Sequence, residues 1–387
     1  MLANDTGSAH FSGRLFVIFN GRFPSEQAHS LFVAKSAEAF STIGCENIIL
    51  SPDRNRTKVT SKEYFKLTIE PNIVYLKTID FSKFKMLRVP AYYLGNIIFG
   101  IQVRTFLKKN ASKSDIIYTN DSHVLPFLKS YYVCYELHDF PERYFGLYRF
   151  LFSFAKKILV TNTWKENKLH ELFKGTIGKT FVELNAVDLE KFTVHKTKQE
   201  LRIDLGLNQA EKIVLYTGHL YGWKGAEVLA EAARLLPEVS FYFLGGKPHD
   251  VNTFKKKYIS VGNIHILGHQ QHELIPAWQK AADVLVIPNS GKSKIARYYT
   301  SPMKLFEYMA SGVPVVASDL PSIREIADET MVYFAESDNP LSFAQTISTV
   351  FGDTEQIKKV RRAYELVSKH TWRDRAQRIL AQLRAPS

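Results

Sequence analysis

Two glycine-containing loops carry the basic residues that a phosphate group requires. The first, within "LYTGHLYGWKGAEVL", places His219 and Lys224 between Gly218 and Gly225, directly before a predicted helix. The second, "IPNSGKSKIARYYTSPMK", is free of acidic residues and contains Lys292, Lys294, Arg297 and Lys304. Glycine permits a ligand to approach the backbone, and the positive end of a helix dipole favours an anion. Each loop alone is also typical of a solvated turn, but the two together predict a diphosphate site.

The second loop leads into a short helix that holds a lysine and a carboxylate on one face. Lys304 and Glu307 are three residues apart, so the simplest interpretation is a surface ion pair worth a few tenths of a kcal/mol. Ser301 is predicted to be the N-cap, Pro302 the first helical residue and Gly312 the residue after the helix. The "VPVVA" that follows is apolar enough for a buried strand.

Parallel sheets are expected to position these loops, because apolar segments alternate with amphipathic helices along the chain. The first series of predicted strands is "LFVIF", "NIILS", "NIVYL", "DIIYT", "YYVCYEL", "KILVT" and "TFVEL", with a helix from Gln27 to Ile43. The second series is "KIVLYTG", "VSFYFLGG", "NIHILG", "DVLVIP", "VPVVAS" and "MVYFA". The pattern predicts an α/β protein of two Rossmann-like, doubly wound parallel-sheet domains. We expect ligands in a central cleft, at the carboxyl edges of the sheets.

The domain boundary is predicted in a polar stretch near Phe192 to Gln209. This gives a first domain over residues 1–195 and a second over residues 196–370. The last residues, 371–387, are predicted to form a helix that packs back toward the first domain. The first β-loop-α unit lacks a G-x-G-x-x-G fingerprint, which argues against a dinucleotide site there.

Composition and charge restrict the class of protein further. The 387 residues are 45% hydrophobic and carry a net charge of +13, which favours anionic partners. From Arg54 to Lys109, basic residues far outnumber acidic ones and alternate with apolar side chains. That segment predicts either a solvated helix face or a basic surface for an anionic membrane. Two distant cysteines, Cys45 and Cys134, and the absence of a basic start before the first apolar run predict a soluble protein of the reducing cytoplasm.

The ordered set of motifs resembles the retaining, GT-B-fold nucleotide-sugar glycosyltransferases of group 1. In the second half these motifs are "LYTGHLYGWKG", "FYFLGG", "NIHILGHQQHELIPAWQKAADVLVIPN" and "SPMKLFEYMASGVPVVASDLPSIREI"; in the first half they are "FPSEQAHSLFVAKSAEAFSTIG", "YELHDFP" and "ELNAVDLEKF". The resemblance implies transfer of a sugar from a nucleoside diphosphate, UDP rather than GDP, to a lipid-linked or surface-polysaccharide precursor. It implies no other cofactor, and the sequence has no D-x-D motif for a bridging metal.

The resemblance also implies roles for individual residues. Glu307 matches the second Glu of the family's E-x7-E motif, which holds the ribose hydroxyls. Lys224 resembles the lysine that neutralises the leaving diphosphate, and His138 the histidine near sugar and acceptor, although "CYELHD" alone predicts an ordinary hydrogen-bonded His at a strand end. The remaining donor-side positions are Gly218, His219, Tyr299, Ser301, Pro302, Met303 and Lys304; the acceptor-side positions are Arg22, Ser25 and Glu26.

Two positions depart from the family pattern. Tyr299 stands where the first Glu of E-x7-E is expected, and His219 where the family commonly has an Arg. Tyr299 leaves two hypotheses for the donor: a neutral sugar, with the nearby lysines in solvent, or an acidic sugar such as a uronic acid. The alternatives to a transferase are a nucleotide-sugar-binding scaffold of a glycan assembly complex and a GT-B sugar-nucleotide epimerase. A nucleic-acid binder is disfavoured because no such motif occurs.

Overall fold

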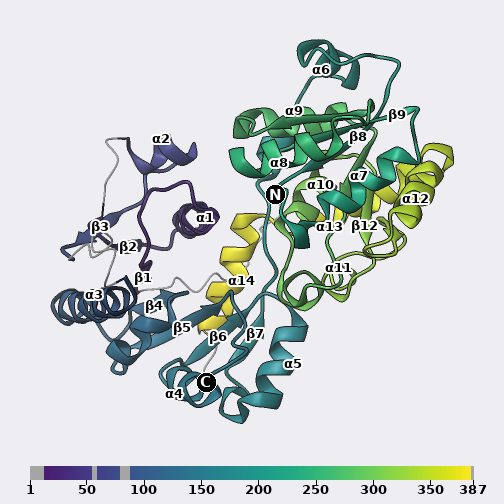
Figure 1. Ribbon diagram of the computed structural model, residues 1–387. Helices are drawn as coiled ribbons and strands as arrows, with labels where there is room; N and C mark the ends of the chain where they lie inside the picture. Colours follow the sequence, from purple (N-terminus) through teal and green to yellow (C-terminus); the bar gives the residue numbers. More distant parts are fainter. Residues whose placement is uncertain (1–12, 55–58, 79–87, 385–387) are drawn as a thin grey trace, which may run out of the picture. The chain divides into compact units, whose positions relative to one another are not determined.

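The chain folds into two compact units, seen in a computed structural model that describes residues 13–54, 59–78 and 88–384 (Figure 1). The N-terminal domain contains the described residues up to Val160, Glu166–Glu183 and the final helix from Trp372. The C-terminal domain contains Thr161–Lys165 and Leu184–Thr371. The predicted boundary at residues 195 and 196 lies in the connection between η5 (Leu189–Phe192) and α6 (Lys198–Asp204).

A seven-stranded parallel sheet, in the order β3-β2-β1-β4-β5-β6-β7, forms the N-terminal domain. Its strands are β1 (Leu15–Ile18), β2 (Asn47–Pro52), β3 (Ile73–Leu76), β4 (Ile116–Thr119), β5 (Tyr132–Leu137), β6 (Lys157–Val160) and β7 (Thr180–Val182). The connecting helices are α1 (Ala28–Thr42), α2 (Ser61–Phe65), α3 (Arg88–Asn110), η3 (Ser122–Leu128), α4 (Phe145–Phe152), α5 (Thr163–Leu172) and η4 (Lys174–Thr176). Ile18 of β1 pairs with Thr119 of β4, so the loops after these two strands start side by side at the carboxyl edge.

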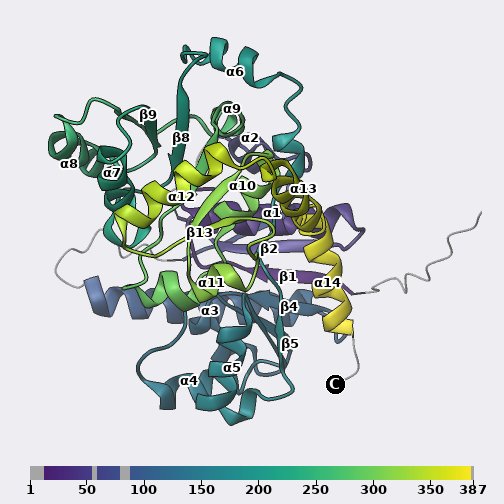
Figure 2. The ribbon, with the colours of Figure 1, turned by 90° about the vertical axis from the view of Figure 1, so that its right-hand side faces the viewer.

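The final helix α14 (Trp372–Arg384) completes this domain although it comes last in the sequence. Its Ala376, Ile379 and Leu380 are buried in the same core as Val33 and Ala37 of α1. Figures 1 and 2 both show α14, in yellow, beside the purple and blue elements of the first sheet. The apolar spacing of α14 is therefore explained by burial against α1.

A six-stranded parallel sheet, in the order β10-β9-β8-β11-β12-β13, forms the C-terminal domain. Its strands are β8 (Lys212–Thr217), β9 (Val239–Leu244), β10 (Ile264–Gly268), β11 (Val284–Ile287), β12 (Val315–Ser318) and β13 (Tyr333–Ala335). Its further helices are η6 (Gly222–Lys224), α7 (Ala226–Arg234), α8 (Pro248–Tyr258), η7 (His272–Leu274), α9 (Ile275–Ala281), the π-helix η8 (Ile295–Tyr299), α10 (Met303–Ser311), α11 (Pro321–Arg324), α12 (Pro340–Gly352) and α13 (Gln356–Val367). The predicted α/β class and every predicted strand of both series are confirmed.

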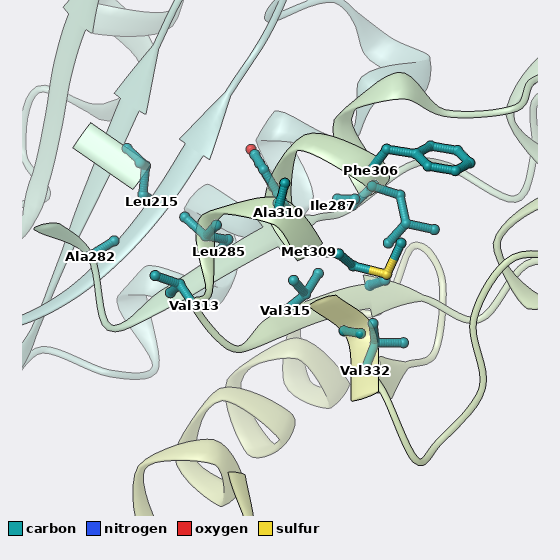
Figure 3. Close-up of a cluster of buried hydrophobic side chains, with 14 of the residues drawn as sticks. Leu215, Ala282, Leu285, Ile287, Phe306, Met309, Ala310, Val313, Val315 and Val332 are labelled. Atoms are coloured by element: carbon teal, nitrogen blue, oxygen red, sulfur yellow. The ribbon is translucent and has the colours of Figure 1, made fainter. Parts of the chain in front are cut away.

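The helix after the second basic loop, α10, is fixed to this sheet by its apolar face. Phe306 and Met309 pack in one buried cluster with Leu285 and Ile287 of β11 and Val315 of β12 (Figure 3). Full burial of one such side chain contributes about 1.5–3 kcal/mol. Because this packing fixes the position of α10, the side chains on its other face point in a defined direction.

The two ends of α10 differ in how well the sequence predicts them. Gly312 takes the left-handed conformation directly after the helix, with φ of 74°, as predicted. The prediction for the start is wrong: Pro302 is the N-cap and Met303 the first helical residue. The Ser301 hydroxyl does not cap the helix but accepts a hydrogen bond from the Asn185 backbone N–H at 3.3 Å.

Within the described part of the chain, no helix is both long enough and apolar enough to cross a membrane. Cys45 and Cys134 are both buried free thiols. Burial raises the pKa of the Cys134 thiol, so this side chain behaves as a small apolar core residue.

Candidate active site

The structure brings the two predicted phosphate loops together at the carboxyl edge of the C-terminal sheet. The loops follow β8 and β11, which are neighbours. The Ser290 N–H donates to the Trp223 carbonyl at 2.9 Å. Gly225 lies against the end of β11 in the left-handed conformation, with φ of 72°, and a Cβ at this position would lie 1.6 Å from the Pro288 carbonyl oxygen. Only glycine fits there, which explains its place after Lys224.

Tyr308 and Thr217 attach α10 to the end of β8. The Tyr308 hydroxyl accepts the Thr217 backbone N–H at 2.9 Å and lies 3.0 Å from the Thr217 hydroxyl. Lys304 lies one turn before Tyr308, and its Nζ donates to the same Thr217 Oγ1 at 3.2 Å. This arrangement turns the Lys304 ammonium toward the loop that contains Lys224.

The cations at this edge destabilise one another. Burial, aided by the charge of Lys304, lowers the pKa of Lys224 to about 8. Burial also lowers the pKa of Lys304, against the opposing effect of Glu307. The pKa of His219 is lowered by burial and then by Lys224, Lys304 and Lys247. Cationic side chains with lowered pKa values, grouped together, are what is expected where a protein binds an anion.

Aromatic rings and the helix start complete the surroundings of the cation cluster. Lys224 Nζ lies 3.9 Å from the centre of the Trp223 ring, and the His219 ring stacks on Tyr221 at 5.0 Å. The N-terminus of α10 adds the positive end of a helix dipole. Gly218, His219, Lys224 and Lys304 therefore stand together, as the donor-side prediction requires.

Glu307 is half-buried in the second turn of α10. Among the residues that the structure describes, its carboxylate makes no ion pair with Lys304, so the interpretation of the two as a surface pair is wrong. Its charge nevertheless acts on Lys304 and on His272, which places it at the rim of the cation cluster. The carboxylate is thus available for hydrogen bonds to a ligand.

Tyr299 ends the π-helix η8 and packs on an aromatic neighbour. The rings of Tyr298 and Tyr299 each lie 5.1 Å from that of Trp164. Asn162 Nδ2 donates to the Tyr298 carbonyl at 2.8 Å, and Asn185 Nδ2 donates to the Ser301 carbonyl at 2.5 Å. These contacts fix the path of the chain from Tyr299 to Met303. The other basic residues of the loop, Lys292, Lys294 and Arg297, are exposed.

Sequence reasoning did not single out three residues of this cluster. They are Thr217, Tyr308 and Lys247. Thr217 is the last residue of β8, and Lys247 follows the glycine pair after the neighbouring strand β9, so their positions at strand ends are signals that the sequence contains. Tyr308 carries no comparable signal, because a tyrosine on the inner face of a helix is usually a core residue.

His138 lies in the N-terminal domain, directly after β5. Its Nε2 is 3.3 Å from Oε1 of Glu136, and its ring packs on Phe32 at 4.9 Å and on His29 at 5.0 Å. Burial and the nearby His138 lower the pKa of His29 to about 4. His138 is therefore half-exposed, ordered by two rings and placed beside a carboxylate.

The carboxylate of Glu136 belongs to a buried ion pair. Arg375 Nη2, from α14, lies 2.6 Å from Glu136 Oε1, and the two side chains are 2% and 0% exposed. Tyr118 donates its hydroxyl to the other oxygen. Burial alone would raise the pKa of Glu136, but Arg375, His138 and Tyr118 outweigh it and hold that pKa well below its usual range. An ionised Glu136 therefore stabilises the orientation of His138. The sequence pattern does not predict the role of Arg375, because Arg375 lies 239 residues from Glu136 in the chain.

The predicted acceptor-side residues lie in the loop between β1 and α1. Arg22 and Glu26 form an ion pair with each other. Ser25 is buried, and its backbone N–H donates to Ser30 Oγ at 3.1 Å. Within the described ranges, no group of three or more His, Cys, Asp and Glu side chains is arranged to hold a metal ion.

Comparison with known proteins agrees with this architecture. Residues 211–353 match the family described as Glycosyl transferases group 1. The D-inositol 3-phosphate glycosyltransferase of Jonesia denitrificans is 25% identical over 243 residues, which are 58% of this chain and 55% of that protein. TuaH of Bacillus subtilis, a glycosyltransferase assigned to teichuronic acid biosynthesis, is 26% identical over 181 residues, 46% of this chain and 44% of that protein. The chain thus spans about half the length of these curated relatives.

Solved structures resemble nearly the whole chain. Sucrose-phosphate synthase of Thermosynechococcus elongatus superposes with a TM-score of 0.76 at 17% identity, over 96% of this chain and 98% of that one. HepE of Anabaena, in complex with UDP-glucose, gives 0.73 at 16% identity, over 96% and 100%. At these identities the similarity shows the fold alone. That fold has two parallel-sheet α/β domains, as in the GT-B glycosyltransferases. Residues 211–353, in the C-terminal domain, are thus similar in sequence to the group 1 glycosyltransferases.

Proposed function

We propose that the protein transfers a sugar from a UDP-sugar to a lipid-linked or surface-polysaccharide precursor, with retention at the anomeric carbon. The observation that carries the proposal is the cation cluster of His219, Lys224 and Lys304 at the start of α10. The pKa values of all three are lowered in the absence of an anion. Burial is the largest cause for each, and neighbouring cations lower the pKa values of Lys224 and His219 further. A bound diphosphate would offset both effects by supplying negative charge beside the cations.

The chemistry of glycosyl transfer explains why fixed cations belong at this place. When the bond between the anomeric carbon and the diphosphate oxygen breaks, negative charge develops on the diphosphate and positive charge on the sugar. Lys224 and Lys304, already held in position, stabilise the leaving group without reorganisation at the moment of reaction. Glu307 would hold the ribose hydroxyls, since its carboxylate is half-buried beside the cluster. His138, in the N-terminal domain, would be the histidine near the sugar and the acceptor.

The choice of UDP and of a glycan acceptor draws on related proteins. HepE was solved with UDP and with UDP-glucose, and TarM of S. aureus with UDP. TuaH is assigned to teichuronic acid biosynthesis by its name. Because Lys292, Lys294 and Arg297 are exposed, we expect a neutral donor sugar rather than an acidic one.

We place the reaction at an anionic membrane, on its cytoplasmic face. On α3, the large apolar side chains of Leu94, Ile97 and Ile101 are exposed, in addition to those of Tyr92 and Tyr93. The C-terminal part of the same helix exposes Arg104, Lys108 and Lys109. Apolar groups beside cations suit a surface of anionic lipids. Part of the basic segment predicted from the sequence, residues 55–58 and 79–87, lies outside the described residues.

A thermal-shift panel tests the donor part of the proposal. UDP, GDP, UDP-glucose, UDP-galactose, UDP-N-acetylglucosamine and UDP-glucuronic acid would each be added to the full chain. A ligand at 100 times its dissociation constant stabilises the folded state by about 2.7 kcal/mol. We expect stabilisation by UDP and by at least one neutral UDP-sugar. Stabilisation by none of the six would contradict the proposal.

Tyr299 supports one competing hypothesis. Because it replaces the first Glu of the motif, a protein that binds nucleotide sugar without transferring it, as part of a glycan assembly complex, is the alternative. A GT-B epimerase would also bind UDP-sugars but would interconvert two of them. Nucleotide binding without turnover would indicate the scaffold, and interconversion without an acceptor would indicate the epimerase. The anomeric proton coupling of a product, measured by NMR, would decide whether configuration is retained.

A further inference from the structure

We propose that Tyr92, Asn96, Asp121 and His123, at the carboxyl edge of the N-terminal sheet, form a subsite that binds a neutral sugar or polyol group of the acceptor. The inference rests on the proposed function for its biological role. It adds residues of α3 and of the segment after β4 to the loop of Arg22, Ser25 and Glu26. Its evidence is a set of buried polar atoms that have no hydrogen-bond partner among the described residues, beside an exposed aromatic ring.

Asp121 and His123 provide the polar centre of the subsite. They follow β4, where Asp121 Oδ1 accepts the His123 backbone N–H at 2.8 Å and lies 2.9 Å from His123 Nδ1. This contact raises the pKa of His123 and fixes its ring. The Asp121 side chain is only 13% exposed, yet among the described residues its Oδ2 has no hydrogen-bond partner. A buried carboxylate oxygen without a donor is costly, so it is well suited to receive a ligand hydroxyl.

A second pair of polar side chains lies on the adjacent strand end and on α3. Asn20, two residues after β1, donates its Nδ2 to Asn96 Oδ1 at 2.9 Å. Asn96 is 4% exposed, and in the described part of the chain its Nδ2 and the Asn20 Oδ1 are buried without hydrogen-bond partners. Because Ile18 pairs with Thr119, Asn20 and Asp121 leave neighbouring strands at the same level.

Tyr92 supplies the apolar wall that a sugar ring requires. It lies one turn before Asn96 on α3, and its ring stands perpendicular to the His123 ring at 5.7 Å. Tyr92 is 56% exposed, so much of its surface is open to a ligand. Aromatic rings bind the C–H face of a sugar, while carboxylate and amide groups bind its hydroxyls.

The subsite lies near the candidate catalytic histidine. Asp121 and Asp139, which follow β4 and β5, both act on the charge of His29, and the His29 ring packs on His138 at 5.0 Å. A sugar bound at Tyr92 and Asp121 would therefore lie in the same part of the N-terminal domain as His138. The two carboxylates would repel a phosphate or a uronic acid, which is why we infer a neutral ligand.

Saturation-transfer NMR on the full chain tests this site directly. The probes are methyl α-D-glucopyranoside, methyl β-D-galactopyranoside, methyl α-D-mannopyranoside and methyl N-acetyl-β-D-glucosaminide, with methyl β-D-glucuronide as the acidic counterpart. We expect at least one neutral glycoside to bind, and better than the glucuronide. Tyr92→Ala and Asp121→Asn should each weaken that binding by about tenfold or more. Tyr92→Phe should retain it, and Thr105→Ala, an exposed position of the same helix, serves as the matched control.

Three results would overturn the inference: no neutral glycoside binds, the glucuronide binds better, or Tyr92→Ala binds like the parent protein. If Asp121→Asn fails to fold, Tyr92→Ala still decides, because that side chain is exposed. Thermal shifts with UDP on the same variants separate this inference from the proposed function. Loss of glycoside binding with UDP binding intact would locate the effect in the subsite. Glycoside binding in a protein that binds no UDP would leave the subsite in place and contradict the proposed function.

Discussion

The side chain of Lys224 loses its proton more easily than an exposed lysine does. Its pKa is lowered to about 8, and only the protonated form attracts a diphosphate. We therefore expect UDP affinity, measured by isothermal titration calorimetry, to be nearly constant from about pH 7 to pH 8. Above the pKa it should fall by up to about tenfold per pH unit, because binding then requires uptake of one proton.

Lys224→Arg is the matched control for this pH dependence. A guanidinium stays protonated far above pH 8, so the variant should keep its UDP affinity to higher pH than the parent protein. Any remaining loss would belong to Lys304, whose pKa is also lowered. If the parent protein binds UDP equally well at pH 7 and pH 9.5, the assignment of Lys224 to the diphosphate is wrong.

Glu307 is expected to act on the ribose rather than on Lys304. Glu307→Gln should weaken UDP binding by about 1 to 3 kcal/mol, the cost of degrading a charged hydrogen bond. The unfolding free energy should change little, because the carboxylate makes no ion pair with Lys304 among the described residues. The comparison with 2′-deoxy-UDP is informative: the parent protein and the variant should bind this analogue with more similar affinities. Unchanged affinity for UDP itself would exclude the ribose role.

At the scale of elements, the loop between β8 and α7 depends on one glycine. Gly225→Ala would place a Cβ 1.6 Å from the Pro288 carbonyl oxygen, at a φ of 72°. We expect it to lower the unfolding free energy by at least about 1–3 kcal/mol and to displace Lys224, so that UDP affinity falls as well. Gly222→Ala is the control in the same loop, since no atom lies within 4 Å of a Cβ there. Equal urea-unfolding midpoints for the two variants would refute this explanation of the loop.

Local patterns predict the elements well and the contacts between them poorly. The strands and α10 follow from apolar runs and from Gly312, all of which are local signals. The start of α10 could not be predicted, because the Ser301 hydroxyl is used by Asn185, 116 residues earlier. His219, Lys224 and Lys304 of the cation cluster can be predicted, because each lies in a glycine-containing loop or at the helix start that follows one. Tyr308 and Arg375 cannot, because their partners Thr217 and Glu136 are distant in sequence.

At the scale of the whole molecule, the net charge of +13 and the exposed apolar side chains of α3 predict membrane binding. Sedimentation with vesicles should show strong partitioning to phosphatidylcholine with phosphatidylglycerol, and weak partitioning to phosphatidylcholine alone. Each lysine or arginine near the surface contributes about 1 kcal/mol, which salt screens. Replacing Lys108 and Lys109 by serine should reduce the binding, and Ile97→Asp should reduce it at all salt concentrations. Equal binding to both kinds of vesicle would contradict the membrane proposal.

The central claim is that this chain cleaves a UDP-sugar with the help of Lys224. The direct measurement is the rate of UDP release from the UDP-sugar that gives the largest thermal shift, for the parent protein and for Lys224→Ala, with melting temperatures recorded for both. We expect measurable release by the parent protein and a rate lower by roughly 10² to 10³ in the variant at an unchanged melting temperature, because one preorganised charge is removed from beside the leaving group. Near-equal rates in a folded variant, or binding without any release by the parent protein, would contradict it.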